Sequence, residues 1–243
     1  MLLLLLFLEL YLKAIPLDAA TAAYLMAGPN GDDGFNDYND GLDQLAFFGF
    51  ITQADADARK VNLVAGANSI LIEDDQLHDI SQYDPSLEGR GQMRPIKAGE
   101  LALLTAATVL NTVPEGRTAI DVYGVTWPLP DKYTLTADEL TRHASRLADF
   151  NAAIAAQATS SNLALVDAYT IMISAAIGGG ILVDGQMLLP DFSPNGFYST
   201  DGLHPNPRGQ AIIANAFIDA INSKYGSTLH NVDVLNLPGV SLK

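Results

Sequence analysis

The residues best suited to chemistry are a carboxylate and an imidazole three positions apart, Asp201 and His204, within FYSTDGLHPNPRG. Gly202 opens a turn between them, so one compact loop can bring the carboxylate to Nδ1 of the imidazole. That hydrogen bond selects the tautomer and leaves Nε2 free as a general base. Such a base can deprotonate a serine hydroxyl, which then attacks an ester carbonyl. The alternative for Asp-x-x-His alone is a chance pair on a solvated loop.

The residues that follow His204 predict a helix. Asn206 is a good N-cap, and Pro207 suits the first helical position. Apolar side chains at 213, 217, 220 and 221 then share one helical face. The Asp201/His204 turn therefore stands directly before a terminal amphipathic helix, and this context makes the pair a far more specific signal.

Composition bounds the class of protein. A chain of 243 residues with 49% apolar residues suits one α/β domain with a sizeable core. Lys and Arg number 13 against 28 Asp and Glu, which gives a net charge of −15. Such a surface repels phosphates, so we expect neither nucleic acid nor an anionic membrane as a partner. The absence of cysteine excludes disulfides, thiol nucleophiles and Cys-ligated metals.

Metal binding is weakly indicated. The loop 28–41 (GPNGDDGFNDYNDG) is rich in Asp, but it lacks the EF-hand spacing, and acidic turns are usually only solvated. Asp201 and His204 are too few ligands for zinc. The other histidines show no ligand spacing: His78, His143 and His230. We therefore expect no metal and no cofactor.

Helical patterns cover 18–27 with Asp18 as N-cap, about 41–48, and 53–60. The best-marked helix runs from Thr136 to about Ala158 and opens with a capping box between Thr136 and Glu139. Its apolar positions recur at intervals of three and four, which predicts an inward-facing stripe with His143 at the core edge. The stripe comprises Leu140, His143, Leu147, Phe150 and Ile154.

Strand patterns cover 61–66 (VNLVAG) and 163–168 (LALVDA), and 69–74 is extended or a short helical piece. The second run follows the long helix after a short turn at Asn162, which is half of a βαβ unit and predicts a mainly parallel sheet. It delivers Asp167 to the strand end where open α/β sheets bind ligands. Capping the next segment is the simpler role for Asp167.

The first 14 residues, MLLLLLFLELYLKA, hold the longest apolar run. A bilayer span needs about 20 apolar residues, so we expect no transmembrane span. A secretory signal carries basic residues before its apolar stretch, and none precedes Leu2. The length of the run favours a buried strand or helix.

Asp201, His204 and Pro205 match the Asp-x-x-His-Pro block ahead of the final helix in the GDSL or SGNH hydrolases. The chain resembles a branch of this family common in Bacteroidetes, from about residue 15 to 235. Further stretches that carry the resemblance are LDAATAAYL, GELALLT, LTADEL, ALVDA and KYGST. It implies a carboxylic ester hydrolase (esterase or lipase) with His204 as general base and Asp201 orienting it. It also implies a three-layer α/β/α sandwich with a mainly parallel sheet, a small-molecule ester substrate, and export or attachment to the cell envelope.

The family's nucleophile lies in a Gly-Asp-Ser-Leu motif, and Gly and Asn blocks complete its oxyanion hole. No Gly-Asp-Ser occurs here. Gly34-Phe-Asn36-Asp37 matches the Asn block by its letters, but it sits in a loop with no strand before it, so we interpret it as coincidence. Ser69 is interpreted as a turn residue. The nucleophile and the oxyanion hole therefore stay unassigned.

The resemblance then implies that residues 15–243 are the C-terminal portion of a longer hydrolase, preceded by an atypical leader, 1–14. The sheet would lack its first strands and expose an edge, which the leader could fill as a surrogate strand or a second copy could pair with. Two hypotheses stay open. The chain is a serine ester hydrolase with Asp and His of the triad present, or it is a catalytically inactive fragment or accessory binding domain that keeps the fold.

Overall fold

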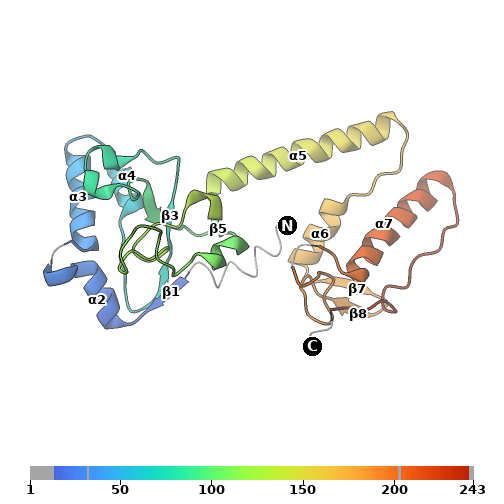
Figure 1. Cartoon of the computed structure of the whole chain (residues 1–243). Coiled ribbons are helices and arrows are strands. Elements are labelled where there is room, and N and C mark those ends of the chain that lie inside the picture. Colours follow the sequence, from blue (N-terminus) through green and yellow to red (C-terminus); the bar gives the residue numbers. More distant parts are fainter. Residues whose placement is uncertain (1–13, 32, 202–203, 241–243) are drawn as a thin grey trace. The chain divides into compact units, whose positions relative to one another are not determined.

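The computed structural model describes residues 14–31, 33–201 and 204–240 (Figure 1). These residues form six α-helices, and their strands pair as four two-stranded antiparallel sheets. The fold is thus a mixed α/β one, and the mainly parallel sheet expected from sequence is not among the described strands. The residues up to Arg142 and those from His143 onward form two compact units, called here the N-terminal and the C-terminal unit.

In the N-terminal unit three strand pairs accompany three helices. β1 (Ala14–Leu17) pairs with β2 (Gly66–Ser69), β3 (Leu71–Glu73) with β4 (Met93–Pro95), and β5 (Leu101–Ala102) with β6 (Thr134–Leu135). The helices are α2 (Ala19–Ala27), α3 (Phe35–Phe47) and α4 (Gln53–Arg59). Short 3-10 turns connect them: Pro29–Gly31, Ile80–Gln82, Pro85–Leu87, Leu104–Thr108 and Asp131–Tyr133. An isolated parallel bridge joins Ile72 to Leu129.

The structure confirms the predicted cap of α2, whereas helix α3 begins at a different residue from the one predicted. Asp18 Oδ1 accepts a hydrogen bond from the Thr21 amide at 2.7 Å, which confirms the predicted N-cap of α2. Helix α3 begins at Phe35, six residues before the predicted start near Gly41. Phe35 and Leu42 are buried on one face of α3. Their burial outweighs the poor helix propensity of the Asn, Asp and Gly residues between them.

The prediction of a strand at 61–66 is wrong, although part of this segment is buried. Val61 and Leu63 are buried, but regular pairing begins only at Gly66. The Asn68 side chain bonds both backbone groups of Val64, accepting from its amide at 2.8 Å and donating to its carbonyl at 2.9 Å. A side chain therefore satisfies backbone groups that a strand ladder would otherwise pair.

A buried ion network holds β4. Arg94 donates to Asp74 Oδ2 at 2.7 Å and to both carboxylate oxygens of Glu100 at 2.6 and 2.7 Å. Burial disfavours the charged form of Glu100, but hydrogen bonds from Arg94 and the Lys97 amide outweigh burial and hold the pKa of Glu100 below its ordinary value. The guanidinium and both carboxylates are thus all partnered.

The C-terminal unit holds most of α5 (Ala137–Ser160), then α6 (Ala168–Ile177), the hairpin β7 (Ile181–Val183) and β8 (Gln186–Leu188), and α7 (Pro207–Tyr225). Its core gathers residues of α6, β8, α7 and the segments on either side of α7. These are Ala175, Leu188, Phe197, Tyr198, Ala211, Ile212 and Val234. Two predicted starts are confirmed: the capping box at α5, where the Thr136 amide donates to Glu139 at 2.8 Å, and the Asn206 cap of α7.

Two predictions about this unit are wrong. Residues 163–167 form no strand, and Leu163 is 53% exposed. Most of the stripe on α5 is exposed: Phe150 is 67% exposed, and Ile154 and His143 are exposed as well, whereas Leu140 and Leu147 are half-buried. Periodicity identifies the face that a helix could bury, but it does not supply the strand layer against which that face would pack. Asp167 instead caps α6, accepting from the Thr170 amide at 2.9 Å, as its simpler role predicted.

Within the described ranges, none of the helices has the length and apolar character needed to cross a bilayer.

Candidate active site

The site begins with a turn that the core anchors. Phe197 and Tyr198 are buried, and Tyr198 forms an antiparallel bridge with Pro205. The Ser199 amide donates to the His204 carbonyl at 2.8 Å, which closes the turn between them. Both ends of this turn are therefore fixed to the core, while Asp201 and His204 stand at its exposed end.

The predicted carboxylate–imidazole contact forms in this turn. Asp201 Oδ2 lies 2.6 Å from His204 Nδ1, and Asp201 Oδ1 accepts from the His204 amide at 3.0 Å. A carboxylate on Nδ1 favours the tautomer with its proton there, which leaves Nε2 as an acceptor. The His204 side chain is 74% exposed and that of Asp201 51%. The imidazole is thus oriented and open to an approaching molecule.

Sequence reasoning did not identify Ser199 as part of this arrangement. Its hydroxyl donates to Asp201 Oδ1 at 2.6 Å, so it positions the carboxylate. The signal available in the sequence was only its spacing of two from Asp201, which is common in turns of serine and aspartate.

Asn206 ties the turn to α7. Its Oδ1 accepts from the amides of Arg208 and Gly209 at 3.0 and 3.1 Å, which caps the helix. Its Nδ2 donates to the carbonyls of Gly196 and Tyr198 at 2.8 and 3.1 Å. One buried side chain therefore fixes the helix start and the strand-like segment before the turn at the same time.

A profile of the GDSL-like lipase/acylhydrolase family matches residues 35–217. The chain belongs to this family. The match covers more than half of the chain and includes the Asp201/His204 turn and the first half of α7. No curated protein and no solved structure gave a significant match to the chain.

An apolar cavity of about 200 Å³ adjoins the turn. Pro205, the neighbour of His204, forms part of its wall together with Tyr198 and Gly209. The rest is lined by Phe197 and by apolar side chains of α6, β7 and α7: Met172, Ile181, Ile212 and Ile213. The volume and lining suit a small apolar group.

Among the described residues of the C-terminal unit, no serine hydroxyl hydrogen-bonds to the His204 imidazole, and the Ser199 hydroxyl faces the carboxylate instead. Gly34 is the N-cap of α3, and Ser69 ends β2, both in the N-terminal unit. The nucleophile and oxyanion donors that the family uses stay unassigned here.

No group of three or more potential ligands that could hold a metal ion occurs in the described part of the chain. His78, one of the other histidines, takes part in a local network: its Nε2 lies 3.1 Å from the Tyr83 hydroxyl and 2.8 Å from Gln82 Nε2. The His78 ring therefore makes hydrogen bonds within its own loop, residues 78–83.

Proposed function

We propose that this protein is a serine-type carboxylic ester hydrolase in which His204 is the general base and Asp201 its positioning residue. The observation that carries the proposal is the 2.6 Å contact between His204 Nδ1 and Asp201 Oδ2 on an imidazole that is 74% exposed. Family membership supports the reaction class, because the family is one of acylhydrolases.

In the proposed reaction His204 Nε2 takes the proton of a serine hydroxyl as its oxygen attacks the acyl carbonyl. Asp201 stabilises the imidazolium that forms. The imidazolium returns the proton to the leaving alcohol oxygen as the ester C–O bond breaks. A water molecule then repeats the sequence and releases the carboxylic acid. Ser199 contributes by holding Asp201 Oδ1 at 2.6 Å.

The apolar cavity beside Pro205 supports a short acyl group as substrate. Its volume of about 200 Å³ suits a few carbon atoms, and its lining offers no charged side chain. We therefore propose that esters of short carboxylic acids are cleaved faster than esters of long ones.

A fluorophosphonate probe and nitrophenyl acetate test the activity together. We expect the probe to label one serine, and the ester to be cleaved at a rate that His204→Gln lowers by about 10²–10⁴-fold, the usual contribution of a general base. His230→Gln is the matched control, because His230 is an exposed histidine of the same unit that lies outside the turn. Equal rates for the two variants would remove His204 from the mechanism.

A second function has one observation in its favour, namely that no serine hydroxyl described in the C-terminal unit hydrogen-bonds to the His204 imidazole. If the probe labels nothing and the ester stays intact, the chain is a non-catalytic member of the family that keeps the fold. Labelling at Ser199 would contradict the positioning role that its bond to Asp201 assigns.

We also propose the family's three-layer α/β/α arrangement with a mainly parallel sheet for residues 15–243, and export or attachment to the cell envelope. The parallel contact at Leu129 supports the first: its amide donates to the Leu71 carbonyl and its carbonyl accepts from the Glu73 amide, each at 2.9 Å. Detection of the protein in fractionated cells would test the second.

A further inference from the structure

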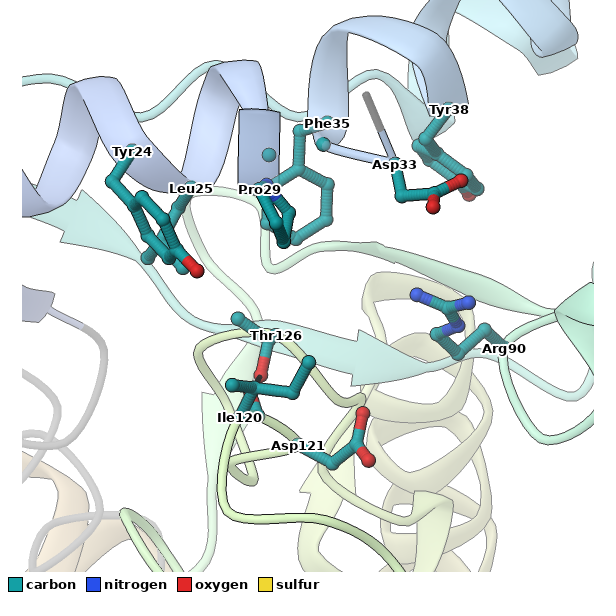
Figure 2. Close-up of a pocket in the computed structure, with 12 residues that line it drawn as sticks. Tyr24, Leu25, Pro29, Asp33, Phe35, Tyr38, Arg90, Ile120, Asp121 and Thr126 are labelled. Atoms are coloured by element: carbon teal, nitrogen blue, oxygen red, sulfur yellow. Dashed lines mark hydrogen bonds between the residues drawn. The ribbon is translucent and has the colours of Figure 1, made fainter. Parts of the chain in front are cut away.

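The N-terminal unit contains a pocket that the proposed hydrolysis does not use. It has a volume of about 100 Å³ and adjoins a groove of about 520 Å³ along α3. The two share four lining residues: Asp33, Gly34, Tyr38 and Arg90. Figure 2 shows the Arg90 guanidinium pointing toward the side that carries Asp33 and Tyr38, with Asp121 on a loop at another side of the pocket.

The Arg90 guanidinium is incompletely paired. Its Nε is buried and has no hydrogen-bond partner, while one terminal nitrogen donates to the Ser86 carbonyl at 3.2 Å. No ion pair links Arg90 to a carboxylate within the described residues. The other terminal nitrogen of Arg90 has no hydrogen-bond partner among the described residues and is not among the buried atoms, so this side of the pocket favours a ligand that offers an acceptor.

The carboxylates of the pocket, in contrast to Arg90, can bind hydrogen-bond donors of a ligand. Asp121 Oδ2 accepts from the Thr118 amide and hydroxyl at 3.0 and 2.8 Å, whereas no hydrogen bond to its Oδ1 occurs among the described residues. Asp33 also lines the pocket, in a left-handed backbone conformation with φ of 64°. An ionised carboxylate only accepts hydrogen bonds, so these groups favour a ligand that offers donors.

Apolar and aromatic surfaces complete the walls. Leu25, Phe35 and Ile120 line the pocket, together with the half-exposed ring of Tyr24. In the groove, Leu45, Phe48 and Leu87 extend this surface along α3. A ligand that fills both spaces therefore needs apolar faces as well as polar edges.

We propose that this pocket and groove bind an uncharged sugar. Hydroxyl groups both donate and accept, so one ring can accept from Arg90 and donate to Asp33 and Asp121, while its C–H faces cover the apolar walls. A simple carboxylate would meet Arg90 but would be repelled by the two aspartates. An alkyl ammonium ion would meet the aspartates but offer no acceptor to the Arg90 guanidinium.

Trp127, the single tryptophan of the chain, provides the readout. Its ring lies 5.7 Å from Arg90 Cζ and 4.2 Å from Arg117 Cζ. A sugar that bonds Arg90 changes the surroundings of this ring, so its fluorescence reports binding. The probes are cellobiose, chitobiose and maltose at millimolar concentration, with octanoate and dileucine as the charged and zwitterionic comparison compounds.

We expect at least one disaccharide to change the fluorescence in a saturable manner, with a dissociation constant that isothermal titration calorimetry reproduces. Arg90→Gln should weaken binding about tenfold or more, which is the loss of one charge-assisted hydrogen bond. Asp33→Asn should also weaken it, and this variant keeps the fold because Asn tolerates the left-handed conformation. Arg117→Gln is the matched control, because Arg117 contacts the same ring but does not line the pocket.

Binding that Arg117→Gln leaves intact and that both pocket variants weaken would support the sugar site. The inference is overturned if no disaccharide saturates the signal, if octanoate or dileucine does so instead, or if both pocket variants bind as the unchanged protein does. None of these outcomes depends on His204, so they leave the proposed hydrolysis untouched.

Discussion

Asn206 offers the sharpest test of how the Asp201/His204 turn is held. Its side chain is 4% exposed and makes four hydrogen bonds, two to the amides that begin α7 and two to carbonyls of the preceding segment. In Asn206→Ala the cap is lost, which costs about 1 kcal/mol. The two buried carbonyls also lose a donor, at about 1 kcal/mol each or more. The free energy of unfolding should therefore fall by about 3 kcal/mol.

Asn206→Asp separates the two contributions. An aspartate keeps the cap and complements the helix dipole, but it cannot donate to the carbonyls of Gly196 and Tyr198. This variant should lose about 2 kcal/mol or more, because a carboxylate is placed against two carbonyl oxygens. Asn215→Ala is the matched control: it is the same substitution on the same helix, and it removes two exposed hydrogen bonds to Val232. We expect it to cost about 1 kcal/mol or less.

Urea unfolding followed by far-UV circular dichroism measures these differences. Trp127 belongs to the N-terminal unit, so its fluorescence is not the appropriate signal for α7. If Asn206→Ala costs no more than Asn215→Ala, the buried double role assigned to Asn206 is wrong. Ester hydrolysis should fall in parallel with the loss of the turn, while fluorophosphonate labelling identifies any nucleophile independently.

Three further predictions concern other parts of the chain. Glu100→Gln leaves one partner fewer for the buried Arg94 and should lower the unfolding free energy by about 3 kcal/mol at neutral pH. Because the pKa of Glu100 is lowered in the folded state, its contribution to stability is fully present above the unfolded pKa and is lost as the pH falls through the folded pKa. The unfolding free energies of wild type and variant, measured by urea titration, should therefore converge in acid. Gly209→Ala should destabilise the protein by about 1–3 kcal/mol in thermal unfolding, because a Cβ at this position overlaps a backbone carbonyl oxygen. Gly41→Ala should stabilise it by about 0.5–1 kcal/mol, because a Cβ at this position of α3 extends into open space. If Gly41→Ala destabilises and Gly209→Ala does not, this geometry is contradicted. Phe150→Ala on the exposed face of α5 should change stability by about 0.5 kcal/mol or less, and a loss typical of a buried phenylalanine would show that this face is covered.

Local sequence signals predicted local structure well. The caps at Asp18, Thr136 and Asn206 and the Asp201–His204 contact all lie where the residue types place them. Each of these features depends on atoms within three residues along the chain, so no distant segment is needed to form it. The family assignment rests on the Asp-x-x-His-Pro block and on further short stretches along the chain, and it is confirmed by the profile match over residues 35–217.

Hydrophobic patterns, whose burial depends on a segment distant in the sequence, predicted the structure less well. The apolar stripe of α5 and the run 163–168 have the periodicity of buried elements, yet Phe150 and Leu163 are exposed. Hydrophobicity indicates that a segment gains from burial but does not specify what covers it. The same limit applies at 61–66, where Asn68 takes the backbone groups of Val64 that a strand neighbour was expected to pair.

The amino-acid sequence by itself determined the capped starts of α2, α5 and α7, the net negative charge and the oriented imidazole, because charge is a sum over residues and these hydrogen bonds join residues close together in the chain. Only the tertiary structure decided that Ser199 faces the carboxylate, that Asn206 joins the turn to the helix, and that Arg90 shares one pocket with Asp33 and Asp121. The pocket joins segments far apart in the sequence, and the directions of the Ser199 and Asn206 side chains depend on how their turn is anchored to the buried core.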